Sequence, residues 1–410
     1  MGINLRYMSL LSELAEGTRS ASMKRQIINH YLCNYSSTLP DLAKELKVSV
    51  PTITKFISEM TDKGYIISYG KQETNEGRPP ILYGLNPESG YFIGVDIKKY
   101  TLNLAVMNFI GDLFESHMDI PCELPNTPEG LERMCLEITN FIEQLNIDKE
   151  KILNIGINLP GRINPESGYS YSRFNFEERP LADILSERLN YPVSIDNDSR
   201  AMTYGEMVRG IVKGEKNVIF INFSWGLGCG LIFNGEIYNG KSGFSGEFGH
   251  FSIFDNEKMC VCGKKGCLET EVSGLALCHN LIQALHEGKE SIISDQINGE
   301  IDASTLSRII DATNKEDLLC IELIEDIGQK LGRYIASLIN LLNPDLVVIG
   351  GELAKTGDYV LQPIRSAVRK YSLNLVNKDT AVVLSKLQDN AGIIGACMLS
   401  RYKMFKTSAS

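Results

Sequence analysis

Four soft metal ligands in one short segment constrain the fold of this chain more than any other feature of its sequence. They follow the order His250-x9-Cys260-x-Cys262-x4-Cys267, and three of the ten cysteines stand within eight residues. Thiolate and imidazole groups together select zinc, usually in tetrahedral coordination. Three cysteines and one histidine fill all four positions, so the sequence predicts a structural zinc ion without an open position for a substrate. The alternative is a loop whose cysteines hold no metal.

Two glutamates flank these ligands, Glu247 on one side and Glu269 on the other. A metal-bound imidazole can hydrogen-bond outward through its second nitrogen, so a metal here could direct His250 and both carboxylates into one cleft. Carboxylates accept hydrogen bonds from O–H groups, and this set therefore suits a ligand rich in hydroxyl groups. By residue chemistry alone, the two glutamates could equally be solvated surface charges.

Length and composition indicate a cytoplasmic protein of two or three domains. The 410 residues exceed one compact domain. The sequence contains no stretch of about 20 apolar residues, and its N-terminus lacks the charged start, apolar run and cleavage site of a signal peptide. Clustered cysteines in a reducing compartment favour metal ligation over disulfides. We therefore expect no membrane segment.

Charge divides the chain into a head and a body. Residues 1–80 carry a net charge of +2, whereas the remaining residues carry −12, within a total of −10. A head that is neutral to basic on an acidic body is compatible with nucleic-acid binding by the head alone.

The pattern of the head predicts a helix-turn-helix with residues 39–46 as its first helix and 49–63 as its recognition helix. An earlier helix is expected over 23–31, and a β-hairpin follows the recognition helix. Ser49 is a suitable N-cap, and a proline in the first turn costs no hydrogen bond. The residues expected to meet bases or phosphates are Ser49, Pro51, Thr52, Thr54 and Lys55, with Lys63 and Lys71 as further phosphate contacts. A small helical domain that binds another protein is the alternative.

From residue 91 onward, strands and helices alternate, which predicts an α/β fold. Three strands are expected within 91–116, and further strands at about 152–160, 192–196, 217–240, 344–351 and 381–387. Helices are expected at about 128–145, 181–190, 199–210 and 391–402, and over most of the stretch from the last clustered cysteine to about 341.

Several segments of this body resemble the ROK family of repressors and sugar kinases. GLGCGLIFNGEIYNGKSGFSGEFGH followed by CVCGKKGCLE resembles the family signature, and INLPGRINPESG, SIDNDSRAMTYGE and NPDLVVIGG match further family segments in the same order. The resemblance covers about residues 90–400. It implies an actin-like, ribonuclease-H-like fold of two lobes with a sugar cleft between them, and helix-turn-helix heads occur in the repressors of the family.

The resemblance also implies a division of the chain and a set of site residues. Residues 1–22 would form an N-terminal segment, 23–85 a winged helix-turn-helix domain and 90–410 the ROK sugar-binding domain. The first lobe would comprise about 90–206 and a C-terminal helix at about 391–410, and the second lobe about 207–390 with the zinc loop 247–269. The implied zinc ligands are His250, Cys260, Cys262 and Cys267. The implied sugar contacts are Gly161, Asn197, Asp198, Glu247, His250 and Glu269. NEGRPP resembles the wing of family repressors, which implies that Arg78 enters the minor groove.

Two turns bear on whether the chain is a kinase. Asp198 matches the catalytic base of the family's kinases, but the same carboxylate could hold a sugar hydroxyl without reaction. Those kinases carry Asp-x-Gly-Gly-Thr and Gly-Thr-Gly-x-Gly turns, whose glycines let backbone N–H groups approach phosphates. This chain has Lys98 and Lys99 in the first turn, and Ser224 and Trp225 in the second. We therefore do not expect ATP and Mg²⁺ as cofactors, although a lysine could still neutralise a phosphate by charge.

The sequence is most consistent with a sugar-responsive transcriptional regulator of the repressor type. Its expected partners are a double-stranded DNA operator, a sugar or sugar derivative and a second copy of the chain, as a homodimer or homotetramer. The alternative from the enzyme class is an ATP-dependent glucokinase or N-acetylhexosamine kinase with a regulatory head and Asp198 as base. A third reading is a constitutive DNA-binding protein with a vestigial cleft.

Overall fold

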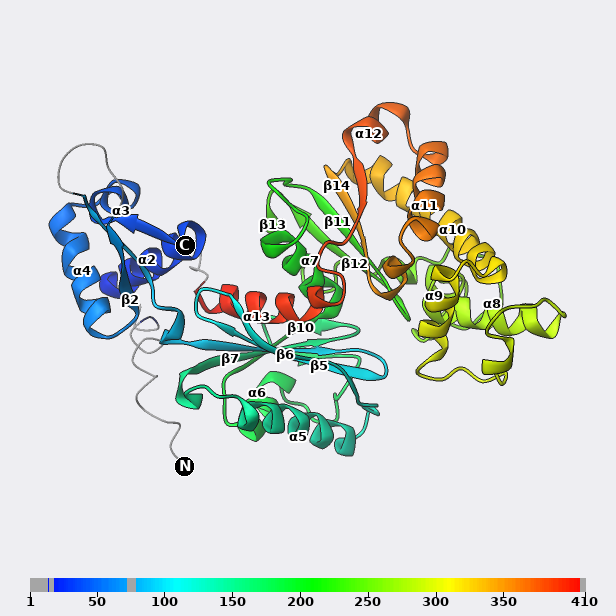
Figure 1. Ribbon diagram of the computed structural model, residues 1–410, viewed down its shortest axis with the longest axis horizontal. Helices are drawn as coiled ribbons and strands as arrows, with labels where there is room; N and C mark the ends of the chain where they lie inside the picture. The colour runs from blue at the N-terminus through cyan, green and yellow to red at the C-terminus, as the bar shows by residue number, and fades with distance from the viewer. Residues whose placement is uncertain (1–13, 15–17, 72–78, 406–410) are drawn as a thin grey trace.

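The computed structural model describes Leu14 and residues 18–71 and 79–405. These residues form a head and a body that contains two five-stranded sheets (Figure 1). The helices are α2 (Arg19–Asn34), α3 (Leu39–Glu45), α4 (Val50–Asp62), α5 (Pro128–Gln144), α6 (Leu181–Leu189), α7 (Asp198–Arg209), α8 (Gly274–His286), α9 (Thr305–Asn314), α10 (Leu318–Leu342), α11 (Asp358–Tyr371), α12 (Asn374–Asp379) and α13 (Asn390–Phe405). The strands are β1 (Ser36–Thr38), β2 (Ile66–Lys71), β3 (Ile81–Leu85), β4 (Tyr91–Ile97), β5 (Thr101–Asn108), β6 (Leu113–Pro121), β7 (Ile152–Leu159), β8 (Ile163–Asn164), β9 (Tyr169–Ser170), β10 (Val193–Asn197), β11 (Val218–Phe223), β12 (Leu227–Phe233), β13 (Glu236–Ile237), β14 (Leu346–Gly350) and β15 (Ala381–Leu384).

The head consists of α2, α3 and α4 and a three-stranded sheet in the order β1-β3-β2. Ser49 caps α4 by accepting a hydrogen bond from the backbone N–H of Thr52, and Pro51 lies in the first turn. The helix predicted over 49–63 is therefore confirmed as α4, with Ser49 and Lys63 as its two caps. The helix expected over 23–31 is longer than predicted, because Thr18 caps it from Arg19 and it continues to Asn34. β1 was not predicted, because its three residues acquire strand structure only by pairing with β3.

The first sheet of the body has the order β10-β7-β4-β5-β6. Its strands β4, β7 and β10 run parallel to one another, while β4, β5 and β6 form an antiparallel meander. The helices α5 and α6 cover one face, where apolar residues such as Met134 and Leu185 pack against Ile93 and Ile155 in one core. Figure 1 shows these two helices below the sheet. The strands and helices expected for this region are confirmed.

The second sheet has the order β13-β12-β11-β14-β15 and repeats the pattern of the first, with an antiparallel meander beside parallel strands. The helices α8 to α11 cover its outer face, where a second core includes Leu277, Ile309, Leu331 and Ile364. The chain from α8 to Leu342 is mostly helical, as expected, although residues 287–304 between α8 and α9 contain no α-helix. The α/β fold class predicted from the sequence is therefore confirmed.

Two helices lie between the sheets. α13 packs on β4, β5 and β7 of the first sheet, and α7 packs on α13 and on β11 and β12 of the second. The helices α7 and α13 approach each other closely. A Cβ added to Gly395 of α13 would lie 1.9 Å from the carbonyl oxygen of Ala201 of α7. α7 begins at Asp198 and ends at Arg209, so it extends for about 18 Å through the body.

The head is packed against the body rather than separated from it. A single core joins Ile27 and Ile57 of the head to Phe92, Phe109 and Phe405 of the body. Two hydrogen bonds cross the same junction: the Asn29 side chain donates to the carbonyl of Phe405 (3.1 Å), and Arg209 donates to the hydroxyl of Tyr35 (2.9 Å). No helix among the described residues is long and apolar enough to cross a membrane.

Candidate metal centre and ligand cleft

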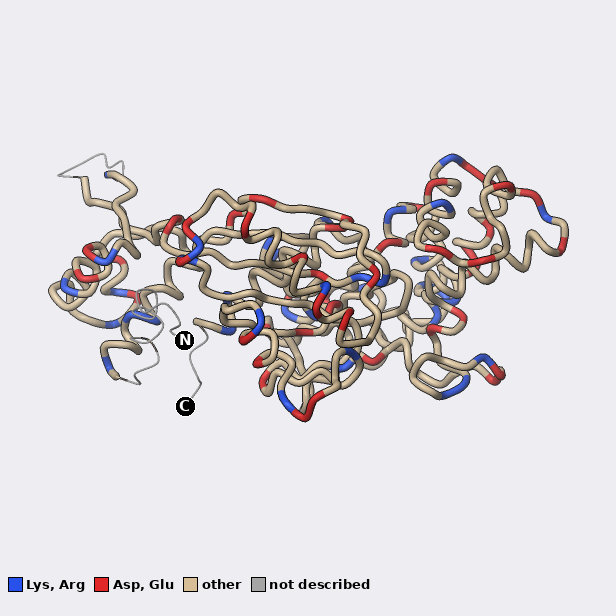
Figure 2. Tube along the Cα trace, turned by 90° about the horizontal axis from the view of Figure 1, so that it is seen from below, with Lys and Arg blue, Asp and Glu red and all other residues tan. Residues whose placement is uncertain are grey.

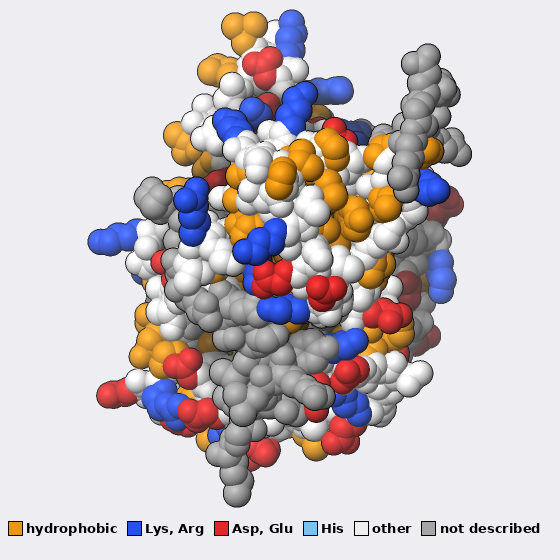
Figure 3. All heavy atoms as spheres, turned by 90° about the vertical axis from the view of Figure 1, so that its left-hand side faces the viewer, with side chains coloured by type: hydrophobic (Ala, Val, Ile, Leu, Met, Phe, Trp, Pro, Cys, Tyr) orange, Lys and Arg blue, Asp and Glu red, His pale blue; other side chains and the backbone are white. Residues whose placement is uncertain are grey.

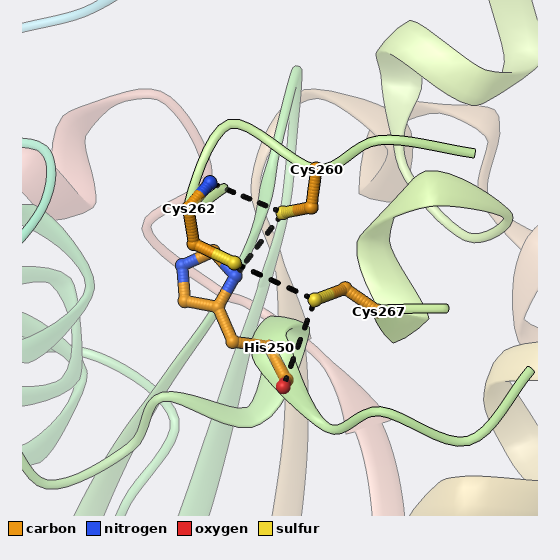
Figure 4. Close-up of side chains that lie close together, drawn as sticks. All are labelled: His250, Cys260, Cys262 and Cys267. Carbon is orange, nitrogen blue, oxygen red and sulfur yellow. Dashed lines mark hydrogen bonds between the residues drawn. The ribbon is translucent and has the colours of Figure 1, made fainter. Parts of the chain in front are cut away.

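The four predicted metal ligands come together in one cluster. Their candidate ligand atoms all lie within 4.8 Å of one another, on His250, Cys260, Cys262 and Cys267 (Figure 4). The Sγ atom of Cys260 is 3.5 Å from Nδ1 of His250, and the Sγ atoms of Cys262 and Cys267 are 3.6 Å apart. Three thiols and one imidazole at this spacing could hold a metal ion in a closed tetrahedral shell.

The loop that carries His250 lies close against β12, and the imidazole of His250 has a carboxylate near each of its nitrogens. Glycine is required at 246, where φ is +87° and a Cβ would lie 2.0 Å from the carbonyl oxygen of Cys229 on β12. Nε2 of His250 is 3.6 Å from Oε2 of Glu247. Glu269 accepts from the backbone N–H of Leu227 (3.4 Å), and its other oxygen is 3.6 Å from Nδ1 of His250. The cluster therefore orients two carboxylates as well as the imidazole.

A cavity of about 1090 Å³ opens between the two sheets. All six residues expected to contact a sugar line it, namely Gly161, Asn197, Asp198, Glu247, His250 and Glu269. We call this part of the cavity the carboxylate end. It joins Gly161 of the turn after β7, Asn197 of β10 and Asp198 of α7 to three residues of the loop 247–269, so the structure brings together every residue of the set.

Asp198 stands at the N-terminus of α7, where helix geometry and hydrogen bonds fix its side chain. Oδ1 accepts hydrogen bonds from the Ser199 backbone N–H (2.7 Å) and from the Asn197 side chain (3.0 Å). The side chain of Asn222 approaches the other oxygen at 3.5 Å. Burial raises the pKa of Asp198 to about 6, and the negative charge of Asp96 adds to this effect. The carboxylate is ionised at neutral pH but titrates close to it.

Asn197 couples α7 to the turn that contains Gly161. Its Oδ1 accepts from the Arg200 backbone N–H (3.0 Å), which caps α7, while its Nδ2 donates to the carbonyl of Gly161 (3.0 Å). Gly161 has a φ of +98°, and a Cβ there would lie 2.5 Å from Ser172. A larger residue would therefore displace this wall of the cleft.

The opposite part of the cavity, which we call the lysine end, contains Lys98, Lys99, Ser224, Trp225 and Glu352. Lys98 is held by Asp119 (3.4 Å) and Asp389 (3.9 Å). Its charge is thus already neutralised by the protein.

The two turns of the lysine end also contact each other. The ammonium group of Lys99 lies 4.4 Å from the centroid of the Trp225 ring, and the ring of Tyr100 meets that indole edge to face at 5.0 Å. Ser224 Oγ accepts a hydrogen bond from the backbone N–H of Glu352 (3.1 Å) and donates to Asn222 (2.7 Å). The backbone N–H of Glu352 and the ammonium group of Lys99, which could otherwise contact a phosphate, therefore already have partners within the chain.

The residues predicted to face DNA are all exposed on α4 or its cap, namely Ser49, Pro51, Thr52, Thr54 and Lys55. The opposite face of α4 is buried through Ile53, Ile57 and Met60. Figure 3 views the molecule from the side on which α4 lies, and Lys and Arg side chains are scattered there among apolar ones. In Figure 2 the head carries basic and acidic residues intermixed. Lys71 is exposed, Lys63 is paired with Glu59 at 3.4 Å, and Arg78 lies outside the described residues.

The cleft includes residues that the sequence analysis did not identify, among them Asp96, Asn222, Arg162 and Tyr171. Asp96 and Asn222 interrupt the otherwise apolar strands YFIGVDI and VIFINF. A polar residue in a buried strand is a signal that could have revealed them, because a buried polar group needs a partner. Arg162 and Tyr171 lie in loops and carry no comparable signal.

Several known proteins are similar to most of this chain in sequence or in structure. A xylose repressor of Caldicellulosiruptor bescii is 29% identical over 376 residues, which cover 91% of this chain and 93% of the repressor. A glucokinase of Halalkalibacterium halodurans is 31% identical over 312 residues, which cover 74% of this chain and 93% of the kinase. A crystal structure of a ROK family transcriptional regulator, a homologue of the E. coli MLC protein, superposes with a TM-score of 0.74 at 28% identity and covers 90% of this chain and 92% of the regulator.

Sequence profiles of two families match separate parts of the chain. The winged helix-turn-helix DNA-binding profile matches residues 22–67, which contain α3 and α4. The ROK family profile matches residues 92–403, which contain both sheets, the metal loop and the cleft. This chain is therefore a member of the ROK family with a winged helix-turn-helix at its head.

Proposed function

We propose that this protein is a sugar-responsive transcriptional regulator, a repressor that binds an operator through α4 and a sugar through the carboxylate end of its cleft. One observation carries the proposal: the chain joins an exposed helix-turn-helix to a kinase-like cleft whose lysine end is occupied by its own side chains. The relatives named above include a repressor that matches the head as well as the body, whereas the glucokinase covers a shorter part of the chain.

The head supplies the DNA-binding surface of the proposal. The exposed N-terminal turn of α4 suits the major groove, and its buried face fixes the helix to the rest of the head. Lys55 and Lys71 would contact phosphates, so we expect operator affinity to fall steeply with salt. A dimer would place two heads on half-sites about one helical turn, or a multiple of it, apart.

The carboxylate end supplies the sugar-binding surface. Asp198, Glu247 and Glu269 are hydrogen-bond acceptors that face the cavity, and Asn197 offers an amide. Sugar hydroxyls donate well to carboxylates, because a charged acceptor strengthens a hydrogen bond. Closure of the cleft over a sugar would shift operator affinity only as far as the sugar binds the two conformations unequally.

We further propose that the cluster of His250, Cys260, Cys262 and Cys267 holds a structural zinc ion. Two sulfurs bound to a tetrahedral zinc at about 2.3 Å stand about 3.8 Å apart, and the Cys262 and Cys267 sulfurs are 3.6 Å apart. With all four positions filled by protein, the ion would stabilise the loop and orient His250 and both glutamates, and it would not activate water.

An operator-retention experiment tests the main proposal. Full-length protein is mixed with labelled DNA from the promoters nearest its own gene, and fluorescence anisotropy is recorded with and without each sugar of a panel. We expect specific retention of at least one fragment and a change in affinity with one sugar class. Retention that no sugar alters would favour a constitutive DNA-binding protein and contradict the sensor.

A sugar kinase with a regulatory head is the second candidate, because Asp198 keeps the position and the raised pKa that suit a general base. A coupled assay of ADP release across the same sugars separates the two. We expect no turnover above background. Sustained turnover that disappears in Asp198→Asn would replace the sensor with the kinase.

A further inference from the structure

Tyr171 lines the cleft, and the ring of Phe244, which is not itself among the lining residues, packs against it next to the lining residue Ser245. Tyr171 lines the cavity and is 51% exposed, and Phe244 is 36% exposed. Their rings meet edge to face with centroids 5.4 Å apart. Tyr171 follows β9, whereas Phe244 lies a few residues before Glu247, so the ring contact joins two loops that are distant in sequence.

A continuous set of contacts connects this aromatic pair to the carboxylate end. The backbone N–H of Tyr171 donates to the carbonyl of Arg162 (2.9 Å), and the N–H of Arg162 donates to Ser172 Oγ (2.9 Å). The preceding residue, Gly161, accepts from the side chain of Asn197 (3.0 Å). Tyr171 is therefore held next to the residues that would bind the first sugar ring.

The loop that carries Phe244 is fixed before a ligand arrives. The buried guanidinium of Arg200 donates to the carbonyl of Gly243 (2.9 Å). Gly243 has a φ of +82°, and a Cβ there would lie 2.6 Å from the ring of Pro165. Preorganisation of this kind lowers the entropy lost when a ligand binds.

We propose that Tyr171, held in place by its contact with Phe244, forms a second subsite, and that the physiological ligand is a saccharide of at least two rings. This inference rests on the proposed sugar-sensing function and names its ligand class. One face of a pyranose presents C–H groups that pack on the electron-rich face of an aromatic ring and bury apolar area. The first ring lies among the carboxylates, and the second lies over Tyr171, where Arg162 can donate to its hydroxyls.

The size of the cavity agrees with such a ligand. Its volume of about 1090 Å³ lies at the upper limit of the range of about 300–1,000 Å³ for small-molecule sites. This volume includes the lysine end as well as the carboxylate end, and Tyr171 lines the same cavity, so a second ring bound beside the first could lie against it.

The charge of the cavity favours a neutral saccharide over a phosphorylated one. Six acidic and five basic side chains line it. Of the basic ones, Lys98 is paired with Asp119 and Lys258 with Glu271 at 2.8 Å. Lys99 lies against the indole ring of Trp225. Three of the five basic side chains therefore already have partners within the chain, which disfavours a phosphorylated ligand.

Calorimetric titration of full-length protein with matched pairs of sugars tests the inference. The pairs are D-xylose with xylobiose, D-glucose with cellobiose and with maltose, and N-acetylglucosamine with chitobiose, and glucose 6-phosphate is a separate probe. We expect one disaccharide to bind about ten-fold more tightly than its monosaccharide. Tyr171→Ala should remove that gain and leave the monosaccharide affinity unchanged, while Tyr171→Phe should keep it.

Tyr238→Ala is the matched control, because Tyr238 is a tyrosine of similar exposure (49%) that is not among the residues lining the cavity. It should preserve both affinities. Equal affinities within every pair that binds, an equal loss of both in Tyr171→Ala, or glucose 6-phosphate as the tightest probe would each overturn the second subsite. Those results leave sugar sensing intact, whereas a protein that binds operator but none of these sugars would overturn the sensor together with the subsite.

Discussion

The two ends of the cleft differ in how their polar groups are satisfied. At the carboxylate end, Asp198 and Glu269 each accept hydrogen bonds from the protein, whereas Glu247 reaches His250 only at 3.6 Å, and all three carboxylates line the cavity. At the lysine end, Lys98 has two carboxylates and the N–H of Glu352 already has Ser224. At the lysine end, groups that could bind a phosphate are instead bound by other groups of the same chain. A site can therefore lose its free donors without a change of fold.

Loss of the metal cluster should have the largest effect on the carboxylate end, because the cluster orients the side chains there. In Cys262→Ser, we expect metal content at background, a melting temperature lowered by several degrees and no measurable sugar binding. Metal analysis, thermal unfolding and calorimetry measure the three effects. Cys33→Ser, which alters an exposed cysteine outside the cluster, should change none of them, and full metal content in Cys262→Ser would contradict the ligand assignment.

Removal of one charge at the carboxylate end should have the next largest effect. Asp198→Asn keeps the size of the side chain but loses the ionic acceptor, so we expect sugar affinity to fall about 30-fold, equivalent to about 2 kcal/mol. Titration calorimetry measures the change, and the exposed Asp183→Asn serves as a matched control. An affinity within two-fold of the parent would mean that Asp198 does not bind the sugar.

Sugar binding at the carboxylate end should depend on pH. Burial raises the pKa of Asp198 to about 6, so the carboxylate becomes protonated as the pH falls through that value and loses an acceptor. We expect affinity to decrease about four-fold between pH 7.5 and pH 5.5. Calorimetry at both pH values checks this, and in Asp198→Asn the decrease attributed to Asp198 should be absent.

The same group has the opposite effect on the stability of the protein without ligand. Its pKa is higher in the folded chain than the ordinary value of 3.8, so the folded state binds the proton more tightly than the unfolded state. The contribution of Asp198 to the free energy of unfolding therefore rises as the pH falls from above 6 toward 4.

The smallest effect is expected at the lysine end. Trp225→Ala removes the indole but leaves Lys98 paired and Ser224 bound to Glu352. We therefore expect sugar affinity to change by less than about two-fold and ATP to remain without effect on the melting temperature. A clear stabilisation of this variant by ATP would show that the indole alone closes the phosphate site.

Local sequence signals were sufficient for most of the helices, though not for the full length of α2 or for α12, and for the cluster of candidate metal ligands. Ser49 and Pro51 fixed the start of α4, because capping depends on neighbours within three residues. The four metal ligands are close in sequence, so their meeting in space required only one loop. The fold class followed from the alternation of elements together with the family resemblance.

Contacts between distant residues were beyond the reach of the sequence. Lys98 meets Asp119 and Asp389, and the partner of Ser224 lies 128 positions away. The chain shows no strong repeat in its sequence, yet the two sheets share one strand pattern. Backbone topology can persist when side chains diverge, and a search for repeated residues does not detect it.

The contact between Asn29 and Phe405, 376 positions apart, has a consequence for biosynthesis. The head is synthesised before the body, because translation proceeds from the N-terminus and N-terminal domains generally fold first. The apolar surface that the head shares with α13 stays uncovered until that helix has been synthesised. The contacts between the head and α13 can therefore form only at the end of synthesis, after the whole body has been made.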